Sequence, residues 1–466
     1  MFNSFSWRSW LFAGLASVTP LEALRAQIIT DGSVGPQATL SGPDMTIGAD
    51  LGSQRGNNLF HSFQQFDIPA QHTATFTGPD TVQNVIGRVT GGNSSRIDGT
   101  LRSQVGRADV YLINPAGVVM DPNAQVDVPA ALHVSTADEL RFPDGAVYSA
   151  RDPSGSTLTM AAPEAFGFLN PQPAAIQLNG TQLEIKPEQK VSLTAGDIAI
   201  RGSEERTAAI RAPGGEIQLQ AKGDLQLDNA RIDTSGDGGG QIAIQARYAH
   251  LTQSTVATDN TGARHAEGGI DIQIDQSLEL TAGSRIQSNT FSSGDSGKIQ
   301  IQAHEMRMHQ QESEGITGVF SEVAEGVSGN TQGIEIAVTD SLFLQGLSVI
   351  HSGTDGEGNS GNITISAGDL RADGGTRKEP YHDGRWFQEG ISIATGKGSS
   401  GDAGSILVEV ANQLDLNYSS ISSYSRGIGK TGDITASAKK MTILDLLKRA
   451  AFLVLPILQA MLLPSL

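Results

Sequence analysis

The chain has 466 residues, of which 55 are glycine and 5% are aromatic, so its core must be built from Ile, Leu, Val and Ala rather than from large rings. The formal net charge of −18 repels phosphate backbones, which argues against nucleic acid as a partner, and favours a soluble monomer. The sequence holds no cysteine, which excludes disulfides, Cys-ligated zinc and thiol catalysis.

Residues 1–26 are predicted to be a secretory signal peptide. Arg8 precedes a short apolar run at residues 9–18, and cleavage after Ala26 would leave Gln27 as the new N-terminus. A buried N-terminal helix is the alternative interpretation. We favour export.

Residues 27–170 show the alternation of strands without a regular repeat. Within them, Asn114-Pro-Ala-Gly117 is a turn sequence, with Pro at position i+1 and a Gly that accepts a positive φ. Taken alone, this motif is a tight turn between two apolar strands.

The order of motifs in this region resembles the N-terminal secretion domain of the filamentous haemagglutinin family, the exoproteins of two-partner secretion. The central match is Leu112-Ile-Asn-Pro-Ala-Gly-Val-Val119, which is similar to the family's Asn-Pro-Asn-Gly-Ile motif but has Ala116 in place of the second Asn. The other matching segments are Asn58-Leu-Phe-His-Ser-Phe63 with Phe66 and Ile68-Pro69, Val82-Gln-Asn-Val-Ile86, Arg88-Val-Thr-Gly-Gly92, Ser95, Ile97-Asp-Gly99, Pro122-Asn-Ala124, Val134-Ser-Thr-Ala137 and Phe142-Pro-Asp-Gly145.

This resemblance implies a partner, an outer-membrane β-barrel transporter that recognises Asn114, Pro115 and Gly117. It further implies passage through the periplasm of a Gram-negative-type bacterium to the outer-membrane surface or the medium, and a right-handed parallel β-helix. Replacing Asn114 is then expected to weaken export with little loss of stability of the rod.

Residues 171–440 are predicted to be β-helix repeats, and a glycine-led pattern recurs in them from Gly215 on. Each anchor glycine precedes a run in which Ile, Leu or Val alternates with polar residues, and successive anchors lie 25, 29, 28, 36, 28, 43 and 28 residues apart. The anchors are Gly215, Gly240, Gly269, Gly297, Gly333, Gly361, Gly404 and Gly432. Alternation with period two indicates strands with one buried face, and no unit can bury its apolar face alone. Stacked units predict a β-solenoid.

Two long spacings predict loops that leave the stack, from Glu312 to Thr331 and from Asp373 to Glu389. The second concentrates aromatic and basic side chains in a chain that has few aromatics, which makes it a candidate binding loop. Its residues of interest are Arg377, Tyr381, Arg385, Trp386 and Phe387. The alternative is a loop that folds back on its own coil.

Residues 441–466 form an apolar tail. The run Ala450–Leu463 is apolar apart from Gln459, is interrupted by Pro456, and is too short to span a bilayer. A cap over the last coil, the end of a truncated reading frame and a membrane-associated tail all remain open.

The sequence therefore predicts an all-β chain, a β-helical secretion domain followed by β-helix repeats. We expect a non-enzymatic adhesin-like exoprotein that binds a host or neighbouring cell-surface glycan or protein, with no catalytic residue, metal ligand or cofactor. A polysaccharide-degrading enzyme, which would need clustered carboxylates on successive coils, and a toxin or cytolysin are the alternatives. The run Gly427-Ile-Gly-Lys-Thr-Gly432 lies between strands without a following helix, so we do not expect it to bind a nucleotide.

Overall fold

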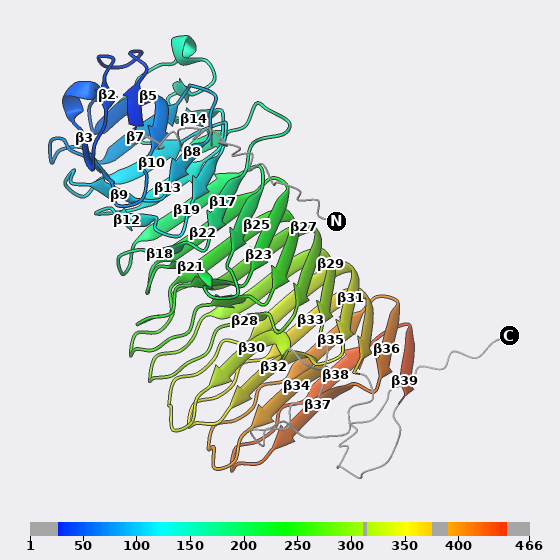
Figure 1. Cartoon of the computed structure of the whole chain (residues 1–466). Helices are drawn as coiled ribbons and strands as arrows, with labels where there is room; N and C mark the ends of the chain where they lie inside the picture. Colours follow the sequence, from blue (N-terminus) through cyan, green and yellow to red (C-terminus); the bar gives the residue numbers. More distant parts are fainter. Residues whose placement is uncertain (1–26, 311–314, 375–389, 445–466) are drawn as a thin grey trace, which may run out of the picture.

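A computed structural model describes residues 27–310, 315–374 and 390–444. These residues form 39 β-strands and two short 3-10 helices, η1 (Ala49–Leu51) and η2 (Pro153–Gly155), and contain no α-helix. The chain winds into stacked coils that run from the N-terminal strands to the C-terminal strands (Figure 1). Strands of successive coils pair in parallel, so the prediction of an all-β parallel β-helix is confirmed.

Each coil places strands on three faces of the rod. The first face contains β5 (Asn58–Asp67), β7 (Asn84–Val89), β10 (Asp109–Ile113), β13 (Leu132–Ser135), β19 (Lys190–Ala195), β22 (Glu216–Ala221), β35 (Ile406–Val410) and β38 (Ile434–Ser437). The second face contains β8 (Ser95–Ile97), β11 (Val118–Met120), β17 (Ile176–Asn179), β20 (Ile198–Arg201), β23 (Asp224–Asp228), β36 (Gln413–Asn417) and β39 (Lys440–Leu444). Five long strands pass through the bend between these two faces, namely β25 (Gln241–Thr252), β27 (Gly269–Thr281), β29 (Lys298–His309), β31 (Ile334–Gln345) and β33 (Ile363–Asp373).

The third face is formed by shorter strands. They are β3 (Asp44–Ile47), β6 (Thr73–Phe76), β9 (Thr100–Ser103), β12 (Gln125–Asp127), β18 (Gln182–Glu184), β21 (Ala208–Arg211), β24 (Ala230–Asp233), β26 (Thr255–Ala257), β28 (Arg285–Gln287), β30 (Thr317–Val323), β32 (Ser348–Thr354), β34 (Gly390–Thr395) and β37 (Ser420–Ser425). At the N-terminal end, β1 (Gln27–Thr30) and β4 (Ser53–Arg55) pair antiparallel with β5, and β2 (Thr39–Leu40) pairs with β1. Strands β1 and β4 thus cover the free edge of the first coil.

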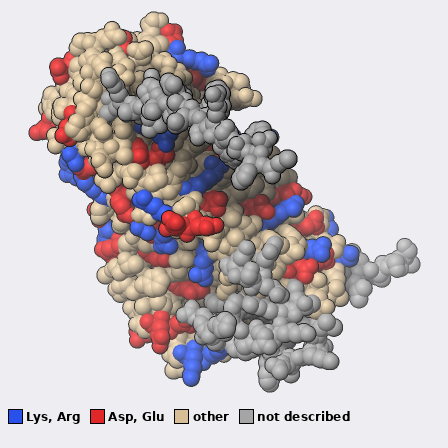
Figure 2. Space-filling view, in the orientation of Figure 1, with Lys and Arg blue, Asp and Glu red and all other residues tan. Residues whose placement is uncertain are grey.

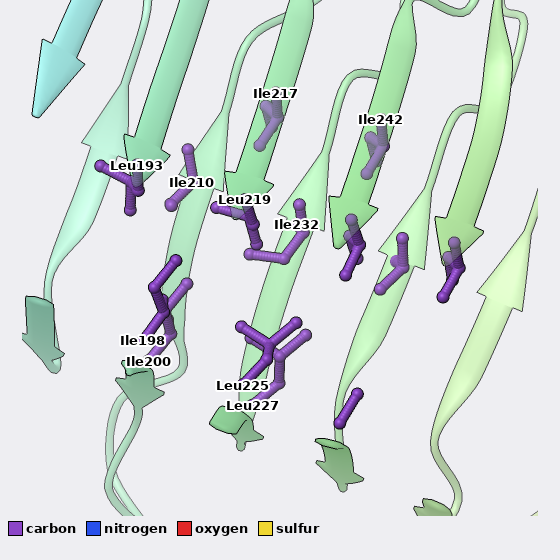
Figure 3. Packing of buried hydrophobic residues seen from close by; sticks show 14 of the residues in the cluster. Leu193, Ile198, Ile200, Ile210, Ile217, Leu219, Leu225, Leu227, Ile232 and Ile242 are labelled. Atoms are coloured by element: carbon purple, nitrogen blue, oxygen red, sulfur yellow. The ribbon is translucent and has the colours of Figure 1, made fainter. Parts of the chain in front are cut away.

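One hydrophobic core fills the rod. It extends from Ile28 to Leu416 without interruption, because equivalent apolar residues of successive coils lie in register, as Ile242, Ile270 and Ile299 do. Ile217, which lies one coil earlier and pairs with Ile242, points into the same interior column as Ile242 (Figure 3). Each such side chain contributes about 1.5–3 kcal/mol through burial.

The anchor glycines lie where coils touch. A Cβ built on Gly404 or Gly432 would overlap the carbonyl oxygen of the anchor one coil before it, Gly361 or Gly404. A second column of glycines shows the same close approach, since a Cβ on Gly401 would overlap the carbonyl oxygen of Gly358. Close approach of backbone to backbone therefore explains why glycine stands at these positions.

Residues 136–175 leave the stack and form a second layer, which we call the outer layer. Its strands β14 (Glu139–Arg141), β15 (Val147–Ser149) and β16 (Ala165–Gly167) make an antiparallel sheet with β14 in the centre. The layer packs a small core against outward-facing side chains of β5, β7 and β10, including the edge-to-face pair of Phe60 and Tyr148 at 4.9 Å. β5 and β7 are thus buried on both sides along most of their length.

Arg88, which is 1% exposed, joins the outer layer to the coils. Its Nε donates to Ser62 Oγ of β5 at 2.8 Å, and its Nη1 donates to the Ser149 carbonyl of β15 at 2.5 Å. The guanidinium also lies over the Tyr148 ring, 4.1 Å from its centroid. A buried charge with several partners is a strong and specific tie between the two layers.

One sequence expectation changes in the structure. The predicted loop from Glu312 to Thr331 is wrong between Thr317 and Val323, where strand β30 lies and pairs with β28 and β32. The extra length lies in the connection from His309 to Thr317, which is longer than the connection from Thr281 to Arg285 one coil earlier. The predicted boundary at residue 170 stays a prediction. Strand β13 pairs directly with β19, and one core runs through the regions on both sides of that residue.

Replacing a core residue and a surface residue of the same strand by alanine should change the free energy of unfolding by different amounts. Ile301→Ala removes a side chain that is 1% exposed, so we expect the free energy of unfolding of this part of the rod to fall by about 2–4 kcal/mol. Gln302→Ala changes an exposed neighbour in β29 and should stay within about 0.5 kcal/mol of the parent. Urea denaturation followed by circular dichroism measures both, and equal shifts would contradict the assignment of the inner face.

The role of Arg88 can be tested against a second arginine. Arg88→Met leaves buried hydroxyl and carbonyl groups unpaired, so we expect a loss of about 3 kcal/mol and faster proteolysis within residues 136–175. Arg107→Met alters an exposed arginine of the same region and should leave both measurements unchanged. If the two variants resist protease equally, Arg88 does not hold the outer layer in place.

Candidate functional site

The Asn114–Gly117 turn connects β10 on the first face to β11 on the second. The backbone N–H of Gly117 donates to the Asn114 carbonyl at 3.0 Å, which closes the turn. Gly117 has a φ of +115°, where a residue with a side chain would be strained, and a Cβ there would lie 3.2 Å from the Ala175 carbonyl oxygen. The structure thus brings the three predicted recognition residues into one tight turn, as the motif indicates.

The Asn114 side chain is fully buried and holds this turn from within. Its Nδ2 donates to the Asn93 carbonyl at 2.9 Å and to Ser95 Oγ at 3.0 Å, both at the same corner one coil earlier. Its Oδ1 accepts from the Ala116 N–H at 2.9 Å, and its own N–H donates to the Ser135 carbonyl one coil later. Asn114 therefore ties three successive coils together.

This burial argues against the expectation that Asn114 can be replaced with little loss of stability. Removing the amide would leave buried donors and acceptors without partners, at a cost of about 1–3 kcal/mol. The partly exposed residues of the turn are Pro115 and Ala116. A protein that binds this turn would contact those two residues and not the Asn114 side chain.

Two further asparagines, at the starts of β5 and β7, fasten the outer layer to the coils. Asn58 Nδ2 donates to the Thr159 carbonyl at 3.0 Å and the Ala161 carbonyl at 2.6 Å, and Asn84 Nδ2 donates to Asn58 Oδ1 at 2.8 Å. The sequence showed Asn58 and Arg88 as parts of a family resemblance but did not reveal these contacts. The partners lie far away in sequence, for example 101 residues from Asn58 to Thr159, so no local pattern could have indicated them.

Two serine hydroxyls link Arg88 to Asp31. Ser62 Oγ accepts from Arg88 Nε and donates to Asp31 Oδ2 at 2.7 Å. Ser33 Oγ likewise accepts from Arg88 Nη2 at 3.0 Å and donates to Asp31 Oδ1 at 2.7 Å. Burial acts to raise the pKa of Asp31, but these hydrogen bonds and one from Thr90 outweigh it, so the pKa lies below its usual value. The carboxylate therefore stays ionised and balances the buried guanidinium.

The first coil also buries a histidine. His61 is 0% exposed and its ring centroid lies 5.4 Å from that of Phe76. Burial lowers the pKa of His61 to about 4, so the imidazole is neutral at neutral pH and packs as an apolar side chain. Tyr148 donates from its hydroxyl to the His61 carbonyl at 2.7 Å, a further contact between outer layer and coil.

The candidate binding loop cannot be placed in this way. Its five residues, Arg377, Tyr381, Arg385, Trp386 and Phe387, lie outside the described residues, as do the predicted signal peptide and residues 445–466.

The face of the described chain that Figure 2 shows has no concentrated charge of one sign, and the described residues form no metal site. Lys and Arg side chains are interspersed with Asp and Glu over the visible face (Figure 2). No group of three or more His, Asp or Glu side chains within residues 27–310, 315–374 and 390–444 could hold a metal ion. Over the same ranges, no helix reaches the length and apolarity needed to cross a bilayer.

Comparison with known proteins identifies the N-terminal part. The family model of the TPS (two-partner secretion) secretion domain matches residues 26–263, more than half of the chain. The match includes the Asn114 turn, the outer layer and the first coils of the repeat region.

Similar proteins share parts of this region. The haem/hemopexin-binding protein of Haemophilus influenzae is 38% identical over 76 residues, which is 16% of this chain and 8% of that protein. The tRNA nuclease CdiA of Escherichia coli is 26% identical over 216 residues, which is 46% of this chain and 6% of that protein. The chain thus spans less than a tenth of the length of these curated relatives. Among solved structures, the HMW1 secretion domain of Haemophilus influenzae is similar at 15% identity with a TM-score of 0.45, covering 89% of this chain and 96% of that one.

The TPS secretion domain implies an outer-membrane transporter as partner and export through the outer membrane. With the family model covering more than half of its length, this chain belongs to the exoproteins of two-partner secretion.

Proposed function

We propose that this exoprotein is a non-enzymatic, adhesin-like rod of one chain, presented at the outer-membrane surface or released from it. Its transporter, a β-barrel with periplasmic domains, binds the coil that carries the Asn114–Gly117 turn. The repeats that follow then contact a glycan or a protein on a host or neighbouring cell.

One observation supports the proposed recognition of the turn by the transporter. The turn is rigid, because Asn114 holds it from inside through three side-chain hydrogen bonds, while Pro115 and Ala116 face outward at the corner of the rod. A preformed, partly exposed turn loses little conformational freedom on binding, which favours recognition. The same corner contacts the end of the outer layer at Ala175.

The polar outer surface of the repeats supports the proposed contact with a glycan or a protein. Gln245, Gln273 and Gln302 lie in register on the first face, and all three are exposed. A row of amides offers both donors and acceptors, which suits the hydroxyl groups of a glycan. Amides do not ionise, so this row cannot act as the acid and base of a glycoside hydrolase. We do not propose haem binding or tRNA cleavage for this chain, because its similarity covers only 8% of the haem/hemopexin-binding protein and 6% of CdiA.

Recognition of the turn can be separated from folding. Ala116→Arg adds a bulky cation to the exposed part of the turn without removing any bond of Asn114, so we expect export to fall about tenfold with an unchanged urea midpoint. Co-expression with the cognate transporter, followed by quantification of surface and medium fractions, measures export.

Gln172→Arg is the matched control for this experiment. Gln172 also follows an Asn-Pro pair, and its N–H donates to Asn170 Oδ1 at 3.1 Å, as the Ala116 N–H does to Asn114. We expect normal export of this variant. Equal export of both variants would show that the transporter does not bind the Asn114 turn.

Adhesion is tested with purified protein on glycan arrays and intact cells. Gln245→Ala combined with Gln273→Ala should reduce binding at least fivefold, whereas Gln226→Ala on the second face should not. Products released from pectin or alginate by the parent protein would instead indicate an enzyme and would refute the non-enzymatic assignment.

A further inference from the structure

The C-terminal end of the rod exposes the side chains that every earlier coil buries. Leu414 and Leu416 of β36 are 1% and 6% exposed, because β39 lies beside them. Their counterparts in β39, Met441 and Ile443, are 40% and 63% exposed. The inward column of the core therefore continues into the last described coil but is left open there.

The first face ends in the same way. Ile406 and Val408 of β35 are buried, and the residues that pair with them in β38 are Ile434 and Ala436. Ile434 is only partly buried and Ala436 is exposed. Among the described strands, β37, β38 and β39 each pair on one side only. An apolar end with unpaired strand edges promotes edge-to-edge association unless something covers it.

We propose that residues 445–466 of the same chain cover this open end. The segment begins immediately after Leu444, at the edge of β39, so it is tethered to the surface that it would cover. It contains the run Ala450–Leu463, in which Gln459 is the one polar side chain. Its apolar composition matches that of the exposed column, and burial against Met441 and Ile443 would remove both surfaces from water.

Tethering also selects this segment over a second copy of the protein. A short link holds its segment at an effective concentration in the millimolar range, whereas another molecule is present at micromolar concentration in a typical solution. At equal intrinsic affinity, the segment of the same chain therefore occupies the end about a thousandfold more often. Intact protein is then expected to be monomeric, although its last described coil resembles an aggregation-prone edge.

The chain contains no cysteine, so a single introduced thiol reports on this surface without interference. Ile443→Cys places it in the exposed inward column of β39. We expect the maleimide labelling rate to be at least tenfold lower in the full-length variant than in the same variant ending at Leu444. Gln302→Cys, at an exposed position of β29, is the control and should label at one rate in both lengths.

Any of three other results would overturn the proposal. Equal labelling of Ile443→Cys in the two lengths would show that residues 445–466 leave the end uncovered. Protection that increases with protein concentration, together with a dimer in light scattering, would assign the end to a second copy. Protection that needs added phosphatidylglycerol vesicles would assign the segment to a membrane surface. A second readout, amide hydrogen exchange at residues 441–444, should show protection in the full chain and its loss on truncation, and covers the case in which the Cys variant folds poorly.

Discussion

The whole molecule depends on one constraint, the fixed distance of about 4.8 Å between hydrogen-bonded strands of adjacent coils. At this spacing each residue touches its equivalent in the coils before and after it, so residue types must agree along columns rather than along the chain. Inside the rod, apolar residues occupy equivalent positions of successive coils. Where backbones approach too closely for a Cβ, glycines do so. At the corners, polar side chains extend the backbone ladder. The Oδ1 atoms of Asp295, Asn330 and Asn359 each accept the backbone N–H of the equivalent residue in the following coil.

The N-terminal coils differ from the repeats, because they begin the stack and carry a second layer on their outer side. Strands β1 and β4 cover the edge of β5, and the outer layer covers the outward faces of β5, β7 and β10. Arg88 is buried and Asp31 is half-buried within this arrangement, and the two are joined through the hydroxyls of Ser62 and Ser33. The charged network gives a unique fit between layers where apolar packing alone would permit sliding. This part of the TPS secretion domain is therefore held together by side-chain hydrogen bonds between its two layers as well as by strand pairing.

Much of this fold could be predicted from the sequence, because the same pattern of glycine and apolar residues recurs in successive coils. The anchors from Gly215 to Gly432 and the alternating runs after them correctly indicated the stacked strands, and the Asn-Pro-Ala-Gly motif correctly indicated a turn. The outer layer could not be predicted in the same way. Its contacts join Asn58 to Thr159 and Arg88 to Ser149, and neither pair follows any sequence period. The burial of Asn114 was missed for a similar reason, since its partners Asn93 and Ser95 belong to the preceding corner. The strand β30 was missed because a longer connection had shifted it from its place in the repeat.

The outer layer has a consequence for how such rods diversify. β13 and β19 remain paired in register although 59 positions separate Leu132 from Val191, more than twice the 26 that separate Val191 from Ile217. An independent sheet has thus been accommodated at a corner without changing the axial rise of the column. Corners of this kind behave as graft points, where new modules can be added while the geometry of neighbouring turns stays the same. Novel binding surfaces can then arise without any redesign of the structural column that carries them.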